Sequence, residues 1–80
     1  MELIVIYWHD ACMYGGATQC ESDIKEYSLM ELISAGILIN ETEYFYTVGS
    51  DYCEKENTFR HVNVYPKSGI LKVRKIKIGK

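Results

Sequence analysis

Short apolar runs separated by polar segments recur along the whole chain, and their residue types are those of β-strands. The run at 2–8, E-L-I-V-I-Y-W, is apolar on both alternating faces and rich in β-branched residues, which predicts a central strand covered on both sides. Later runs have aromatic and β-branched residues in the same manner. We therefore expect further strands at 32–40, 43–49 and 58–65 and a last strand that begins at 71.

The start of the second strand has a helical alternative. In the segment 29–34, Leu29, Leu32 and Ile33 fit a 3.6-residue period. Gly36 and the I-L-I run after it favour a strand instead, and the strand is our interpretation.

The connections differ in length and composition. Residues 9–28 are small and polar, which predicts a long loop with at most one helical turn at 22–27, capped by Ser22. Residues 41–42 predict a short turn that makes the second and third strands a hairpin. The polar segment 50–57 predicts a solvent-exposed loop.

Pro66 is the only proline and stands between two strand-like runs. Its ring fixes φ and removes a backbone donor, so P-K-S-G-I at 66–70 predicts a single tight helical turn that leads into the last strand. Within that strand the phase of the apolar positions slips at Arg74 and Lys75, which predicts a bulge or a strand end there.

This order of elements is that of SH3-like barrels. The prediction is an all-β fold: a small five-stranded SH3-like barrel, with a long first loop and a helical turn before the last strand that flank one groove. Residues 1–80 form a single domain. Because a chain of 80 residues buries only about 60–65% of the surface of its unfolded form, we expect marginal stability or self-association.

Charge is distributed unevenly along the chain. The formal net charge is −2, yet the last fourteen residues hold six of the nine basic residues and none of the eleven acidic ones. A basic last strand is either neutralised by acidic loops or forms a cationic stripe for phosphates. A pI near 5.6 makes general nucleic-acid binding unfavourable.

Targeting signals and reactive side chains are sparse. The apolar runs are too short for a membrane span and the start lacks the features of a signal peptide, which predicts a cytoplasmic protein with reduced thiols. Cys12, Cys20 and Cys53 lack the paired spacing of zinc sites. Cys12 near His9 has neither a nucleophile elbow nor an oxyanion hole beside it. We therefore expect no metal, no cofactor and no enzymatic activity.

Several short motifs nevertheless recur together. The chain resembles a group of small, mostly uncharacterised accessory proteins encoded by tailed bacteriophages, with an apolar first strand ending in W-x-D-A, a glycine-led apolar strand, and an arginine strand running into P-K-x-x-I. The matching residues are Trp8, Asp10, Ala11, Gly36, Ile37, Leu38, Arg60, Pro66, Lys67 and Ile70. One departure is that Gly15-Gly16 is not followed by the tryptophan of that group. The resemblance implies phage origin and an accessory role in the cytoplasm of an infected bacterium, without a particular activity.

Aromatic and charged residues near the predicted loops are the candidates for binding. Tyr7, Tyr44 and Tyr65 are expected mostly in the core. Asp10 either accepts backbone N–H groups of the long loop or faces a ligand. The candidate binding residues are Trp8, Asp10, Tyr14, Tyr46, Tyr52, Arg60 and Lys67.

Two functional hypotheses follow. In the first, a phage-encoded, non-enzymatic protein binds a host or defence-system protein, with an exposed tyrosine such as Tyr14 or Tyr52 as the anchor. In the second, a homo-oligomer acts as a sponge for a small cyclic-nucleotide immune signal, with tyrosines stacking on the base and Arg60 or Lys67 holding phosphate.

Overall fold

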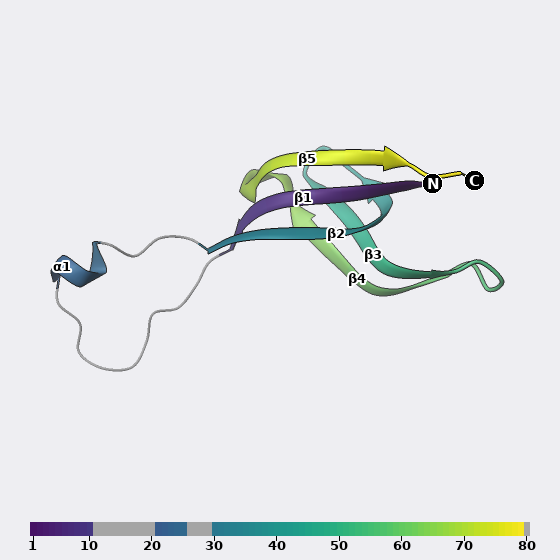
Figure 1. Cartoon of the computed structure of the whole chain (residues 1–80), viewed down its shortest axis with the longest axis horizontal. Helices are drawn as coiled ribbons and strands as arrows, with labels where there is room; N and C mark the ends of the chain where they lie inside the picture. Colours follow the sequence, from purple (N-terminus) through teal and green to yellow (C-terminus); the bar gives the residue numbers. More distant parts are fainter. Residues whose placement is uncertain (11–20, 26–29, 80) are drawn as a thin grey trace.

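The computed structural model describes residues 1–10, 21–25 and 30–79, and this part of the chain is almost entirely β-structure (Figure 1). One helical turn, α1, follows β1 in the chain, and a 3-10 turn, η1, joins β4 to β5. The elements are β1 (Glu2–Asp10), α1 (Glu21–Ile24), β2 (Met30–Glu41), β3 (Phe45–Cys53), β4 (Thr58–Pro66), η1 (Lys67–Gly69) and β5 (Ile70–Lys77).

All pairings in the sheet are antiparallel. Its strand order is β4-β3-β2-β1-β5, so β1 to β4 form a meander and the chain returns through η1 to place β5 beside β1. Within the described residues β4 and β5 do not pair with each other, and the sheet is open. The five-stranded all-β fold and the helical turn before the last strand are confirmed; closure into a barrel is not shown.

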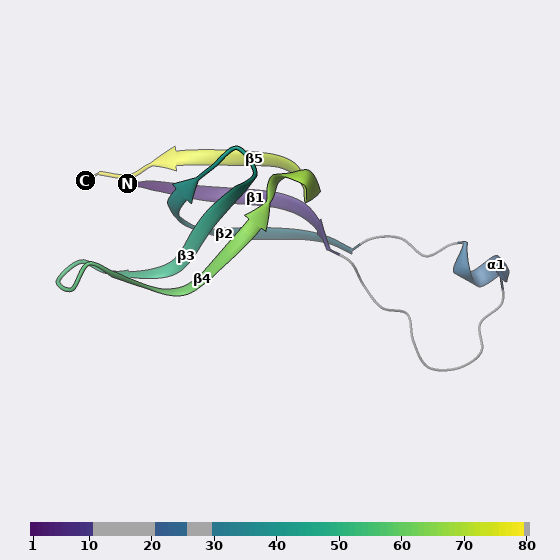
Figure 2. The ribbon, with the colours of Figure 1, turned by 180° about the vertical axis from the view of Figure 1, so that it is seen from behind.

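The core lies on one face of the sheet, which we call the inner face. Ile4 and Ile6 of β1 are completely buried, and they pack with Tyr46 and Val48 of β3. This contact is possible because the sheet twists strongly, so that β3 and β4 cross β1 and β5 obliquely in both views (Figures 1 and 2).

Gly36 of β2 is required for this close packing. A Cβ atom at this position would lie 2.6 Å from the carbonyl oxygen of Gly49 and 2.6 Å from a methyl group of Val48. Backbone atoms cannot move aside as a flexible side chain does, so only glycine fits between β2 and β3 here.

The opposite side of the sheet is called the outer face. On this side of β1, the prediction that the strand is covered on both sides is wrong for the described part of the chain. Leu3, Val5 and Tyr7 point away from the core and are only half-buried. In the described part of the chain no second layer covers them: the elements with which β1 makes its most extensive contacts are its two neighbouring strands and η1.

Strand ends differ from the sequence prediction where pairing extends them. β3 continues to Cys53 because Asp51, Tyr52 and Cys53 pair with β4, so the expected loop at 50–57 shrinks to the turn after Cys53. β2 is a strand from Met30 onward, which decides against the helical alternative there.

Two local predictions were wrong. β5 runs unbroken through Arg74 and Lys75; the register shift instead lies between Tyr7 and Trp8, opposite the stretch from Lys72 to Ile70. α1 begins at Glu21, so Ser22 lies inside the helical turn rather than capping it. Within the described segments, no helix has the length and apolar character that crossing a bilayer requires.

Candidate functional site

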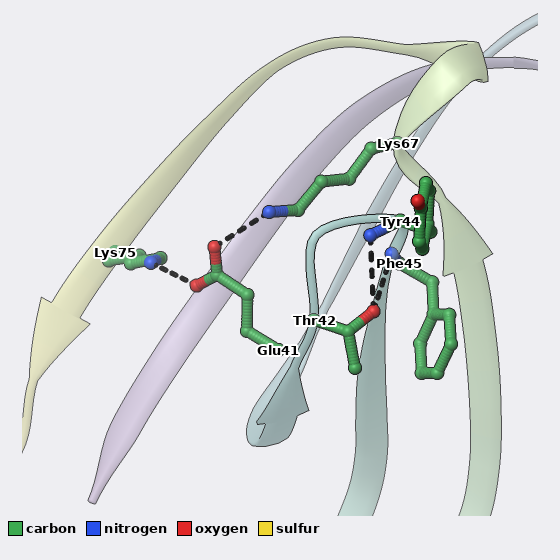
Figure 3. Close-up of polar contacts among 6 residues, drawn as sticks. All are labelled: Glu41, Thr42, Tyr44, Phe45, Lys67 and Lys75. Carbon is green, nitrogen blue, oxygen red and sulfur yellow. Dashed lines mark hydrogen bonds and ion pairs between the residues drawn. The ribbon is translucent and has the colours of Figure 1, made fainter.

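The turn between β2 and β3 is fixed by its own hydrogen bonds. The Oγ1 atom of Thr42 accepts the backbone N–H groups of Tyr44 and Phe45, both at 3.1 Å, and the Thr42 N–H donates to the Phe45 carbonyl at 2.9 Å (Figure 3). A threonine hydroxyl that binds backbone groups two and three residues ahead stabilises a turn locally.

This turn is also held against η1. The backbone N–H of Lys67, the first residue of η1, donates to the Tyr44 carbonyl at 2.8 Å. Phe45 pairs with Pro66 at the end of the β3–β4 ladder. The two segments, 41–45 and 66–69, therefore form one continuous surface, which we call the turn–η1 surface.

A three-residue ion cluster lies on one side of the turn–η1 surface. The carboxylate of Glu41 accepts a hydrogen bond from Lys67 Nζ at 2.8 Å and another from Lys75 Nζ at 2.6 Å (Figure 3). The two ammonium groups also lie 4.8 and 5.6 Å from the ring centroid of Tyr46. Cations over an aromatic face are attracted by its quadrupole, so Tyr46 supports both lysines.

The cluster changes the proton affinity of its members. Hydrogen bonds from Lys67 and then Lys75 hold the pKa of Glu41 below its usual value of 4.5. The hydrogen bond to Glu41 raises the pKa of Lys75 above its usual value of 10.5. Both shifts favour the charged forms of Glu41 and Lys75, which suits a structural clamp between β2, η1 and β5.

Tyr44 is the most exposed aromatic side chain of this surface. It is 72% exposed, and in Figure 3 its ring and that of Phe45 extend from the side of the turn opposite Glu41. Pro66 is exposed next to Phe45. The exposed Tyr44 ring and Pro66 thus lie together on a backbone that is fixed by hydrogen bonds.

The tyrosine assignments made from the sequence were wrong at three positions. Tyr7, expected mostly in the core, is half-buried on the outer face. Tyr44, expected in the core, is exposed, and Tyr46, expected near a loop and proposed for binding, is only 7% exposed and belongs to the core. The alternation of residues along β3 could have predicted the burial of Tyr46, because Tyr46 shares a face with Val48, whereas Tyr44 precedes the strand.

The side chain of Trp8 packs against the core. Its indole N–H donates to the Ser34 hydroxyl at 2.9 Å, and its ring meets that of Tyr65 edge-on at 5.4 Å. Tyr65 packs against the core as predicted. Asp10 ends β1 opposite Met30 and is half-buried, while Tyr14 lies outside the described residues.

Tyr52 and Arg60 lie at the other end of the β3–β4 hairpin. The Tyr52 ring packs on Phe59 at 4.8 Å and its hydroxyl donates to Asn57 at 3.0 Å. Arg60 is exposed opposite Asp51. Along β3, Tyr52 lies seven residues from Phe45, which pairs with Pro66 beside Lys67, and seven residues of extended strand span roughly 24 Å. Arg60 and Lys67 therefore lie at opposite ends of the hairpin, and the structure does not bring them into one site.

The part of the chain that the structure describes has no pocket and no group of three metal-ligating side chains. Cys53 is free and exposed, while Cys12 and Cys20 lie outside the described residues. Comparison of the chain with protein families, curated proteins and solved structures found no match in any of the three.

Proposed function

We propose that the protein is a non-enzymatic binding protein that docks another protein on its turn–η1 surface, with Tyr44 as the anchor. The exposed Tyr44 ring on a fixed turn carries this proposal. Tyrosine dominates many protein interfaces because it contributes a large contact area with few rotatable bonds. A backbone that is already ordered reduces the entropy lost on binding.

The resemblance to tailed-phage accessory proteins supports the choice of partner. We propose a host or defence-system protein in the cytoplasm of an infected bacterium, which the phage protein would sequester or block. A flat aromatic and proline surface suits a protein partner better than a nucleotide, which needs an enclosing site.

We also propose that the open sheet belongs to the SH3-like class. The adjacent first and last strands and the 3-10 turn before β5 support this assignment. In such a barrel the turn–η1 surface would be one wall of the groove whose other wall is the long first loop.

The nucleotide-sponge hypothesis stays a prediction with less support. Lys67 would have to exchange the Glu41 carboxylate for a phosphate, and Arg60 lies at the distant end of the hairpin. A nucleotide site that uses both Arg60 and Lys67 would therefore need one of them from a second copy.

Affinity capture with the tagged chain from a bacterial lysate tests the proposal when it is combined with variants. A captured protein should bind Tyr44→Ala at least about tenfold more weakly than the wild type, and Tyr44→Phe nearly as well, because the ring supplies most of the contact. The matched control is Val64→Ala, which truncates an exposed apolar side chain elsewhere in the sheet, on β4.

Two results would remove Tyr44 from this role. One is unchanged partner affinity in Tyr44→Ala; the other is a larger loss in Tyr52→Ala. Calorimetry with a panel of cyclic nucleotides provides the competing outcome. Tight nucleotide binding that is lost in Arg60→Ala or Lys67→Ala would favour the sponge.

A further inference from the structure

We propose that the outer face of β5, β1 and β2 is the interface of a two-fold symmetric dimer of this chain. This inference does not depend on the proposed function and uses a different surface.

The outer face is apolar on β1 and β2, and β5 adds one apolar side chain and two cations at its edge. In the observed registers, Ile76, Leu3 and Ile37 form one cross-strand row, Arg74, Val5 and Ala35 the next, and Lys72, Tyr7 and Ile33 a third. Ile33 is 68% exposed and Ile76 is 42% exposed. A contiguous apolar sheet face of this kind marks an interaction surface rather than scattered surface residues.

The small core gives a physical reason for a second copy. Only Ile4, Ile6, Tyr46 and Val48 are buried apolar residues in the described part of the chain. Short chains with little core commonly gain the missing burial by association. Packing the outer face against itself would cover both sides of β1, as its doubly apolar sequence requires.

The charges on this face select one arrangement of the two copies. Basic groups lie on the β5 side, at Lys72 and Arg74, whereas Glu31 lies on the β2 side, 3.4 Å from His9. A two-fold axis along β1 places β5 of one copy over β2 of the other, because rotation about that axis exchanges the two sides. An axis across the strands would instead place β5 over β5 and oppose like charges.

The favoured arrangement also fits the side chains row by row. Ile76 would face Ile37 of the other copy, and Arg74 would face the small Ala35. Lys72 would face Ile33, with Glu31 two residues further along the same strand, about 7 Å away and within reach of a lysine side chain. In the single copy Lys72 Nζ rests over the Tyr7 ring at 4.5 Å, so the partner's carboxylate would compensate its desolvation.

Dimer formation leaves the turn–η1 surface free. Glu41 reaches Lys75, which pairs with the buried Ile4 and therefore lies on the inner face of the sheet. The turn thus lies on the side opposite the outer face, and each dimer would present two such surfaces.

Sedimentation equilibrium of the full chain tests the dimer. The wild type should be dimeric, and Ile33→Lys should raise the dimer dissociation constant at least about tenfold, because it places an unpaired charge in the interface. Val64→Lys is the matched control: it changes an exposed β-branched residue of β4, 57% exposed, outside the three strands, and should leave the dimer intact.

A charge exchange makes the test specific for the arrangement. Glu31→Lys should weaken the dimer by opposing Lys72, and the double variant Glu31→Lys with Lys72→Glu should restore it. These variants change exposed groups, so they report on association even if Ile33→Lys fails to fold. A monomeric wild type, an intact Ile33→Lys dimer, equal loss in Val64→Lys, or no rescue by the double variant would each overturn the proposal.

Discussion

At the scale of single residues, the close packing of β2 against β3 depends on the absence of a side chain at Gly36. Gly36 lets the Gly49 carbonyl approach β2, and an added Cβ would lie 2.6 Å from its oxygen. We expect Gly36→Ala to lower the free energy of unfolding by about 1–3 kcal/mol, since the strands must separate to admit the methyl group. Urea denaturation measures this. Gly79→Ala, where a Cβ meets nothing within 4 Å, should be neutral, and equal stability of both variants would contradict the role of Gly36.

Glu41 gives a second prediction, for the effect of pH on stability. Because its folded pKa is lowered, its contribution to stability is present above its ordinary pKa of 4.5 and is lost as pH falls through the folded value. The raised pKa of Lys75 acts in the opposite sense, so the contribution of Lys75 is complete below 10.5 and is lost as pH rises through the folded value.

Thermal unfolding measured against pH checks this prediction with one variant. In Glu41→Gln, stability should fall less than in the wild type as the pH is lowered, because the titration of Glu41 no longer contributes. The pKa of Lys75 should also move down toward its ordinary value. Glu56→Gln, an exposed acid in the β3–β4 turn, should keep the wild-type profile. A profile of Glu41→Gln identical to that of the wild type would show that the clamp contributes nothing.

At the scale of elements, β4 contains a local irregularity. His61 has a φ of 53°, in the left-handed region, and the pair of Ser50 and His61 is missing from an otherwise continuous β3–β4 ladder. A side chain in this conformation costs roughly 1–2 kcal/mol, whereas glycine adopts it freely. The strain is therefore stored in the backbone of an exposed residue.

Two glycine substitutions in β4 separate this strain from the general effect of glycine. His61→Gly should be neutral or stabilising by up to about 1 kcal/mol, since relief of the left-handed φ offsets the added flexibility. Asn63→Gly, two residues along the same strand, should destabilise by about 0.5–1 kcal/mol. Chemical denaturation measures both, and an equal loss in the two variants would contradict stored strain at His61.

Element types were predictable from the sequence to a greater extent than element ends. Aromatic and β-branched runs locate all five strands, and the single proline locates η1. Local sequence does not contain the pairing partner, which is why the polar Asp51 to Cys53 stretch becomes strand once β4 lies beside it. Of the residues on the turn–η1 surface, the sequence analysis named Lys67 as a candidate but placed Tyr44 in the core, because exposure is decided by the register of β3 and by the contact of its turn with η1.

At the scale of the whole molecule, the two faces of the sheet differ in burial. The inner face of β1 forms the core with β3, and the turn–η1 surface lies on that side. The outer face is as apolar near β1 but has no described layer over it. A dimer through the outer face would carry two Tyr44 surfaces, and a partner with two copies of its own site would then bind with avidity.

The dimer predicts that thermal stability depends on protein concentration. Association that is lost on unfolding stabilises by mass action, so the wild-type Tm should rise by about 4 °C for each tenfold increase in concentration. Ile33→Lys should abolish this dependence while keeping the β-sheet signal in circular dichroism, because Ile33 is 68% exposed in the single copy and contributes little to its core. Val64→Lys should keep the wild-type slope. A wild-type Tm that stays constant over the range in which sedimentation detects a dimer would contradict a dimer that persists up to the unfolding transition.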